Sequence, residues 1–249
     1  MNSYEKVLKI LLAFAPGNQP LRTVEISKKL GINNATVNRI LITLKNESFL
    51  VQDEKNRHYR LGPSVALLGS SIKQSLKGRL TAIAKPFLDS LRDKVGETVH
   101  LEELHYDRVY LTYSAKGRRQ LTVTPVVGDR TAINANAGAK AIMAFYPEKE
   151  IIKQLSEKLS VFNASTKTDP AIICEEYKEI RQTGFAYDKG EYDHDVFAVA
   201  APIFNHENQT VAAVVIIAPS FRMEDCIESG SLELLKGTAK EITNRLSKL

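Results

Sequence analysis

Residues 31–46 of the chain (GINNATVNRILITLKN) combine side-chain amides, hydroxyls and one arginine at the spacing of a helix. An arginine can form two hydrogen bonds with guanine, an asparagine can form two with adenine, and alanine or threonine methyls can contact the thymine methyl. A helix of this kind is suited to reading base edges in the major groove of DNA, mainly through its first turns. The candidate base-contacting residues are Asn34, Ala35, Thr36, Asn38, Arg39 and Thr43.

The apolar residues of this stretch lie on the other side of the predicted helix. If each residue advances by about 100°, Ile40, Leu41 and Leu44 fall within about 60° of Val37 and form a buried stripe. Ile42 is apolar but faces outward, and we expect it to pack on the hairpin that follows, although it could contact a thymine methyl. An amphipathic surface helix with an uncharged outer face is the alternative, because helix-turn-helix patterns are short and degenerate.

Two further helices are expected to position this one. Apolar residues at helical spacing predict an amphipathic helix near the N-terminus, which APGNQP (15–20) interrupts. A second helix follows in residues 21–32, with Thr23 as its N-cap and Gly31 in the left-handed position at its end. Asn33 or Asn34 can cap the third helix, which completes a helix-turn-helix. The residues expected to face inward are Tyr4, Val7, Leu8, Leu11 and Leu12, and then Val24, Ile26, Ser27 and Leu30.

A basic hairpin and an uneven distribution of charge extend the DNA-binding prediction. FLVQD and HYRLG flank the polar tip EKNR and predict two short strands, a wing beside the helices. Residues 1–62 hold ten Lys/Arg and five Asp/Glu, a net charge of +5, whereas the remaining 24 basic and 24 acidic residues cancel. Such an excess is expected where a small domain meets a polyanion, and a protein-interaction module would leave it unexplained. The other candidate DNA-binding residues are Arg22, Thr23, Lys55, Arg57 and Arg60.

The rest of the chain predicts a sheet domain of the α+β class. Residues 64–76 form a helical segment that connects the two parts, and a helix follows in LTAIAKPFLDSLRDKVG. ETVHLEEL and DRVYLTYSA alternate as a hairpin turning at HYD. RQLTVTPVVG, GFAYDKGEYD, VFAVAAPIFN and TVAAVVIIAP are predicted strands, and NAGAKAIMAF, the stretch up to about Arg181 and LELLKGTAKEITNRLSKL are predicted helices. Strands without regular strand-helix alternation favour an α+β fold.

Several function classes are disfavoured. No apolar run approaches the roughly 18 residues that span a bilayer. The N-terminus has no apolar signal core, and Cys174 and Cys226 are far apart and outside any CxxC motif. We therefore expect a cytoplasmic protein without disulfides. The enzyme alternative rests on HLEELH, where His100 and Glu102 share one strand face and Glu103 and His105 the other. Neither pair resembles a nucleophile and its base, and no GxSxG, HExxH or P-loop motif is present. We expect neither an enzyme nor a cofactor.

Several motifs in order resemble the IclR family of bacterial transcriptional regulators along nearly the whole chain. The N-terminal ones are LRTVEISKKLGINNATVNRILITL, FLVQ, YRLG and Leu68-Gly69, and the C-terminal ones are GAKAIMAF, GFAYDKGE and VAAPIFNHENQTVAAVVIIAPSFR. The resemblance implies a winged helix-turn-helix in residues 1–62, a linker helix in 63–78 and a GAF-like effector-binding and oligomerisation domain in 79–249. It further implies a recognition helix in 34–46, a wing in 49–60, and homodimers, often paired into tetramers, that bind a double-stranded DNA operator. Asn34 and Ala35 replace the family's usual Lys-Ser, and Ser48 replaces a glycine.

The resemblance also implies an effector pocket between the sheet and the segments INANAGAKA and GFAYDKGEYDHDVFA. Small residues before the helix let backbone amides approach an anionic group, although tight helix-sheet packing would explain them equally well. Relatives that bind small keto or hydroxy acids carry a cysteine and serines where this chain has Ala198, Val215 and Ile217, so a larger, partly apolar carboxylate is expected. The candidate effector-binding residues are Asn136, Ala137, Gly138, Ala139, Asp188, Ala198, Val215 and Ile217.

Two further expectations concern metal and mechanism. Asp188, Glu191, Asp193, His194 and Asp195 form an acidic cluster in which metal binding is conceivable, but the spacing fits no standard motif, and no metal is predicted. Asp188 is instead expected to hydrogen-bond the effector. We expect a repressor whose operator affinity changes because the effector favours one oligomer geometry over another.

Overall fold

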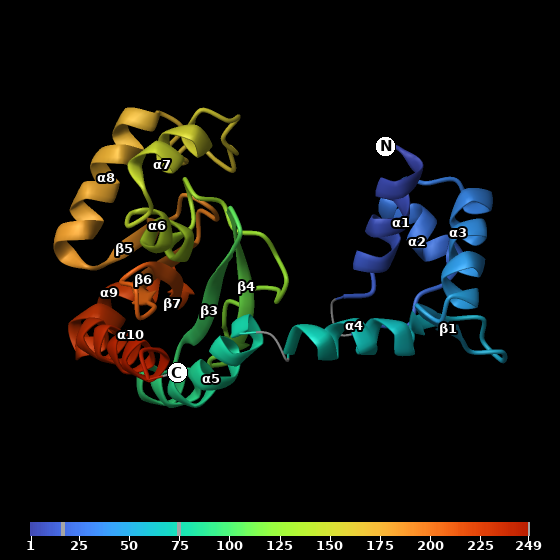
Figure 1. The fold of residues 1–249 in the computed structure, drawn as a ribbon, viewed down its shortest axis with the longest axis horizontal. Helices are drawn as coiled ribbons and strands as arrows, with labels where there is room; N and C mark the ends of the chain where they lie inside the picture. Colours follow the sequence, from blue (N-terminus) through green and yellow to red (C-terminus); the bar gives the residue numbers. More distant parts are fainter. Residues whose placement is uncertain (16–17, 74–75, 249) are drawn as a thin grey trace. The chain divides into compact units, whose positions relative to one another are not determined.

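The computed structural model describes residues 1–15, 18–73 and 76–248. The chain divides into two compact units, Met1–Arg79 and Leu80–Leu249, each described here by itself (Figure 1). No helix in the described part of the chain is both long and apolar enough to cross a membrane.

The N-terminal unit is a three-helix arrangement followed by a β-hairpin and a further helix (Figure 1). The two strands pair antiparallel, with Val51 opposite Arg60. The elements are α1 (Ser3–Leu12), α2 (Thr23–Leu30), α3 (Asn34–Asn46), β1 (Leu50–Gln52), β2 (Tyr59–Leu61) and α4 (Pro63–Lys73). This is the order of a winged helix-turn-helix.

The core of this unit departs from the predicted inward faces of α1 and α2. Ile10 and Phe14 are fully buried, whereas Tyr4, Leu8 and Leu12 are exposed. Both sets follow helical spacing, and packing against α2 and α3 selects the set that contains Phe14. Val24 on α2 is also exposed, and Ile26 alone of that helix is buried. The stripe of α3 agrees with the prediction, because Val37, Leu41 and Leu44 are buried and Ile40 is half-buried.

Local caps fix the turn between α2 and α3. Gly31 has φ of 64° and ends α2 in the left-handed conformation, as predicted. Asn33 caps α3 by accepting a hydrogen bond from the Ala35 amide at 2.8 Å. The N-cap of α2 is Arg22 rather than Thr23, and the Arg22 amide donates to the Glu25 carboxylate at 2.6 Å. Glu25 at the third helical position thus supplies the cap that Thr23 was expected to provide.

The expected linker helix of residues 63–78 corresponds to α4 and the beginning of α5 (Leu76–Val95). Residues 74 and 75 of that expectation lie outside the described residues.

The C-terminal unit is built on a five-stranded antiparallel sheet in the order β4-β3-β7-β6-β5 (Figure 1). β3 and β4 form the hairpin predicted to turn at residues 105–107, and Tyr106 in that turn has φ of 58°. The strands are β3 (Thr98–His105), β4 (Arg108–Ala115), β5 (Ala186–Lys189), β6 (Val196–Phe204) and β7 (Thr210–Pro219). The helices after α5 are α6 (Ala137–Met143), α7 (Glu148–Leu155), α8 (Pro170–Thr183), α9 (Ser220–Cys226), the π-helical η1 (Ile227–Ser231) and α10 (Leu232–Leu246).

Each face of this sheet packs against its own set of helices. On one face, Val99, Leu101 and Val214 join residues of α5 and α10, such as Leu88 and Ile242, in one core. On the other face, alanines of β6 and β7 pack with α6 and α8 in a second core. All seven residues of α6 are buried, because its small side chains allow the helix to lie close to the sheet.

The predicted strand RQLTVTPVVG is wrong, since residues 119–128 form an irregular segment. The Thr98 hydroxyl donates to the Val123 carbonyl at 2.7 Å, and the Gly128 amide donates to the Leu111 carbonyl at 2.7 Å. Pro125 lacks an amide proton and cannot complete a ladder. The segment instead runs past β3 and β4 and helps to enclose a cavity.

Candidate functional site

The predicted DNA-contacting residues divide into two sets in the N-terminal unit. Five of them, Arg22, Thr23, Asn38, Lys55 and Arg57, line one concave surface between the start of α2, α3 and the hairpin. Val24, Ile42, Gln52, Asn56 and Tyr59 complete this surface. The polar members Gln52 and Asn56 were not predicted, although both lie in the same hairpin segment as Lys55 and Arg57.

The second set lies outside this concave surface. Asn34, Ala35, Arg39, Thr43 and Arg60 are exposed, and Thr36 is half-buried. The Thr43 hydroxyl donates to the Arg39 carbonyl at 3.1 Å. Ile42 remains 47% exposed even though it lies on the concave surface beside hairpin residues, so it is available for contact with an apolar group such as a thymine methyl.

The basic residues of segment 1–62 outnumber its acidic residues by five. None of its ten lysines and arginines forms an ion pair with a carboxylate among the described residues, whereas such pairs are frequent in the C-terminal unit. Unpaired cations on an exposed surface can release counterions from DNA when they meet phosphates.

An aspartate shapes the tip of the hairpin. Asp53 accepts hydrogen bonds from the Lys55 amide and the Asn56 side-chain amide, each at 2.9 Å. The hydrogen bond from the Lys55 amide holds the pKa of Asp53 below its ordinary value. Arg57 follows with φ of 60°. The DEKNR sequence therefore positions Lys55 and Arg57 through a turn that the carboxylate closes.

A second candidate site is a cavity of about 210 Å³ in the C-terminal unit. Four of the predicted effector residues, Asn136, Asp188, Ala198 and Ile217, line it. Its remaining lining residues are His100, Leu111, Val123, Thr124, Pro125, Val126, Asp129, Arg130, Thr131, Tyr192, Asp193 and Val196. The lining therefore combines seven apolar residues with nine polar or charged ones.

The other four predicted effector residues, Ala137, Gly138, Ala139 and Val215, are buried and are not part of this lining. A Cβ atom on Gly138 would lie 2.6 Å from Glu102 Oε2 and 2.8 Å from Val215 Cγ2. The start of α6 is therefore packed directly on β3 and β7, and the small residues there serve helix-sheet packing.

Asp188 is the buried carboxyl group of the cavity. Its Oδ1 atom accepts hydrogen bonds from the Glu191 amide at 2.7 Å and the Tyr192 amide at 3.3 Å. Burial raises the pKa of Asp188 to about 6, although these hydrogen bonds and Lys140 oppose the shift. The side chain can thus change its protonation state near neutral pH.

His100 and Glu102 form a buried pair on the face of β3 that contacts the cavity. His100 Nε2 lies 3.0 Å from Glu102 Oε1, and both residues are almost completely buried. His100 Nδ1 has no hydrogen-bond partner among the described residues. Glu103 faces the other side and accepts hydrogen bonds from Thr81 and Thr112. Alternation in the strand predicted this division, but it did not reveal that His100 borders a cavity.

Glu191 of the acidic cluster is held in ion pairs. Lys140 is fully buried, and its Nζ donates to Glu176 and Glu191 at 2.7 Å each and to the Tyr187 carbonyl at 2.8 Å. Lys167 bonds the other Glu176 oxygen at 2.9 Å. Among the residues that the structure describes, no group of three or more His, Cys, Asp or Glu side chains is arranged to hold a metal ion.

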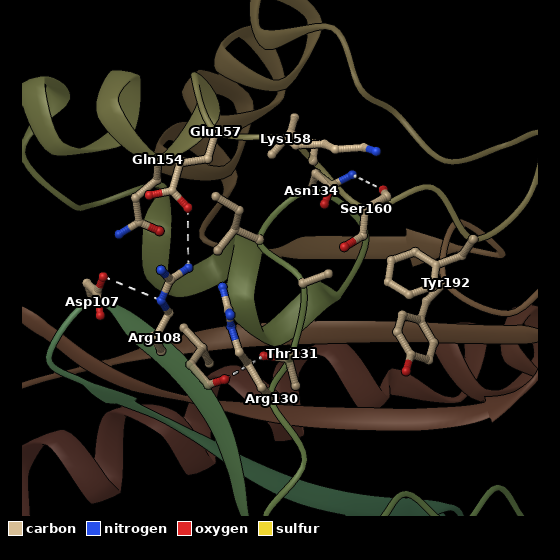
Figure 2. Close-up of a pocket in the computed structure, with 15 residues that line it drawn as sticks. Asp107, Arg108, Arg130, Thr131, Asn134, Gln154, Glu157, Lys158, Ser160 and Tyr192 are labelled. Atoms are coloured by element: carbon tan, nitrogen blue, oxygen red, sulfur yellow. Dashed lines mark hydrogen bonds and ion pairs between the residues drawn. The ribbon is translucent and has the colours of Figure 1, made fainter. Parts of the chain in front are cut away.

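A groove of about 460 Å³ adjoins the cavity (Figure 2). Arg130, Thr131 and Tyr192 line both spaces, so they form the wall between them. Arg108 in the groove pairs with Asp107 at 3.4 Å and Glu157 at 3.6 Å. Arg108 and Arg130 were not among the predicted site residues, whereas Tyr192 lies in the segment GFAYDKGEYDHDVFA that was expected to border the effector pocket.

Comparisons with known proteins agree for both units. Residues 3–54 match the model of the IclR helix-turn-helix domain, and residues 75–244 match that of the bacterial transcriptional regulator IclR C-terminal domain. The chain is 29% identical to the HTH-type transcriptional regulator BhcR of Paracoccus denitrificans over 94% of this chain and 82% of the relative. It is 27% identical to the transcriptional repressor IclR of Escherichia coli over 98% and 89% of the two chains.

Solved structures show the same fold. The IclR protein of Thermotoga maritima has a TM-score of 0.77 and 26% identity, covering 99% of both chains. An IclR homolog from Microbacterium hydrocarbonoxydans, solved with 4-hydroxybenzoate, has a TM-score of 0.81 and 19% identity over the full length of both chains. Because both family models match in order, and the C-terminal model alone spans more than half of the sequence, this chain belongs to the IclR family of DNA-binding bacterial transcriptional regulators.

Proposed function

We propose that this protein is an operator-binding repressor whose DNA affinity changes when a partly apolar carboxylic acid occupies the cavity of its C-terminal unit. In this proposal residues 1–62 bind DNA, residues 63–78 connect the domains, and residues 79–249 bind the effector and support oligomerisation. The carrying observation is the cavity lining, in which seven apolar residues, among them Leu111, Ala198 and Ile217, accompany nine polar or charged ones. Ligand sites of this composition favour molecules with an apolar body and a polar end.

The preference for a larger acid follows from the same residues. Ala198 and Ile217 offer no hydrogen-bonding side chain, so an acid with an apolar body gains more from contact with them than a very small, highly polar acid does. The IclR homolog from Microbacterium hydrocarbonoxydans, which has the same fold, was solved in complex with 4-hydroxybenzoate, and this supports an aromatic acid as the class to test first.

The proposed DNA contacts combine base reading and phosphate binding. Asn38, on the concave surface, and the exposed Arg39 would contact bases, while Lys55, Arg57 and Arg60 would neutralise phosphates. Two copies of α3 read two half-sites only in a dimer, and we propose at least a homodimer. The exposed apolar side chains of Tyr4, Leu8 and Leu12 on α1 support self-association. Light scattering on the eluting full-length protein checks this assembly.

The decisive experiment selects DNA bound by the full-length protein from random sequence and then titrates the enriched site in gel-shift assays. The acids are benzoate, 4-hydroxybenzoate, phenylacetate, glyoxylate and pyruvate. We expect an enriched palindromic site and a change in its affinity with an aromatic acid. The absence of any enriched sequence would support the alternative, a sensory protein whose winged helix binds another protein. A response to glyoxylate or pyruvate without a response to the aromatic acids would contradict the proposed effector class.

A catalytic role and a location outside the cytoplasm find no support in this proposal. The relatives are transcriptional regulators, and the buried His100–Glu102 pair has no nucleophilic side chain hydrogen-bonded to it among the described residues. Action on an operator implies a cytoplasmic protein.

A further inference from the structure

The charges around the effector cavity are unevenly balanced. Three carboxyl groups, those of Asp129, Asp188 and Asp193, belong to its lining, and Arg130 is the one lysine or arginine among the described lining residues. An anionic ligand that leaves water must be compensated by a cation or by several hydrogen-bond donors. The carboxylates nearby increase this requirement because they repel a second negative charge.

The start of α6 does not meet this requirement. The Glu102 carboxylate is fully buried against Gly138, and its Oε2 atom has no hydrogen-bond partner among the described residues. The Ala139 amide already donates to Asn136 Oδ1 at 3.1 Å. A second carboxylate placed there would therefore lie beside the buried Glu102 side chain.

Arg130 is available to an anion. Its backbone is held by a bridge to Tyr110, and the adjacent Thr131 amide donates to the Val109 carbonyl at 3.0 Å. Its side chain is exposed and has no ion-pair partner among the described residues, whereas the neighbouring Arg108 is already paired (Figure 2). Arg130 also lines both the cavity and the groove, so a carboxylate at the boundary of the two spaces is within its reach.

We propose that Arg130 binds the carboxylate of the effector at this boundary and that the apolar part of the effector lies inside the cavity against Ala198 and Ile217. This inference rests on the proposed carboxylate effector and assigns the residue that recognises its charge. The groove, with the cations Arg130 and Lys158 on its walls, is then the route by which an anion approaches the cavity.

The test compares acids with their uncharged amides on the full-length protein by isothermal titration calorimetry. The probes are benzoate and benzamide, 4-hydroxybenzoate and 4-hydroxybenzamide, and phenylacetate and 2-phenylacetamide. The variants are Arg130→Gln and Arg130→Lys, with Arg108→Gln as the matched control, because Arg108 lines only the groove and is engaged by two acidic residues. Circular dichroism and thermal unfolding verify that each variant folds.

We expect wild type to bind at least one acid more tightly than its amide, and Arg130→Gln to reduce that preference by about tenfold or more, as for a hydrogen bond to a charged group. The amide affinity should remain within about twofold, since uncharged contacts are retained. Arg130→Lys should restore part of the preference, and Arg108→Gln should leave it nearly unchanged.

Two failures are distinguishable. If wild type binds an acid and Arg130→Gln keeps the full preference over the amide, Arg130 is not the anchor and the carboxylate effector stands. If wild type binds none of the acids, the proposed effector class is wrong and the assignment of Arg130 falls with it.

Discussion

Replacement of Asp188 by asparagine is expected to stabilise the folded protein at neutral and alkaline pH. Asparagine has nearly the same shape, and its Oδ1 atom can still accept the amide hydrogen bonds of Glu191 and Tyr192. The change removes only the possibility of a negative charge at a position that is 4% exposed. Desolvation of that charge is the main cause of the raised pKa of Asp188.

The magnitude follows from the pKa of Asp188, which burial raises from 3.8 to about 6. A difference of one in pKa corresponds to about 1.4 kcal/mol, so ionised Asp188 destabilises the folded state by about 3 kcal/mol relative to its protonated form. Because the pKa of Asp188 is higher in the folded than in the unfolded protein, its protonated form contributes stability that is fully present below pH 3.8. This stability is lost as the pH rises through about 6, the pKa in the folded protein. At pH 5 the folded protein has already lost about half of this stability, because the Asp188 carboxyl group of the unfolded chain is ionised at that pH and that of the folded chain is still protonated.

Urea unfolding of wild type and Asp188→Asn at pH 5 and pH 8, followed by far-UV circular dichroism, measures this effect. The stability of the variant relative to wild type should increase by about 1.4 kcal/mol between pH 5 and pH 8. Asp193→Asn is the matched control, because Asp193 lines the same cavity but is exposed, and it should show little change. A difference between Asp188→Asn and wild type that is the same at both pH values would refute the reasoning.

Four other substitutions, with Gly237→Ala as a control, test the two units. Arg39→Ala should weaken specific operator binding by about 1–3 kcal/mol if Arg39 pairs with a guanine. Lys55→Ala should weaken binding to all DNA sequences and reduce the slope of log affinity against log salt concentration by about one. Gel-shift titrations on specific and random DNA at several salt concentrations distinguish the two effects. Lys140→Met should destabilise the C-terminal unit by about 3 kcal/mol in urea unfolding, because it removes the fully buried cation from Glu176 and Glu191 and leaves them paired with the half-buried Lys167; an unchanged midpoint would contradict this. Gly138→Ala should cost about 1–3 kcal/mol through overlap with Glu102, whereas Gly237→Ala, where a Cβ meets open space on α10, should be neutral or stabilising.

Local signals in the sequence identified most elements of the N-terminal unit. Gly31, Asn33 and the apolar spacing of α3 act within one or two turns of chain, so they are readable without tertiary contacts. The inward face of α1 was not readable, because Tyr4, Leu8 and Leu12 repeat as regularly as Ile10 and Phe14. Burial of one set depends on where α2 and α3 lie, which periodicity does not specify.

In the C-terminal unit, too, residue periodicity alone did not specify the structure. Alternation predicted β3, β4, β6 and β7, but it also predicted a strand in residues 119–128, where Pro125 and the hydrogen bond between Thr98 and Val123 favour an irregular segment. The motif GFAYDKGE correctly directed attention to Asp188, which lines the cavity. Small residues at the start of α6 were ambiguous between an anion site and close packing, and the position of Glu102 against Gly138 favours packing.

The sequence by itself determined what depends on residue order: two segments of different charge, a helix-turn-helix with amide-rich α3, and the IclR resemblance in both parts. Tertiary structure alone decided what depends on residues distant in the chain. It joined His100 of β3, Arg130 before α6 and Tyr192 after β5 around one cavity. It also left Arg130 without an ion-pair partner among the described residues, beside a paired Arg108. The physical reason is that pairing, burial and desolvation depend on distances in space, which the antiparallel sheet sets by bringing distant strands together.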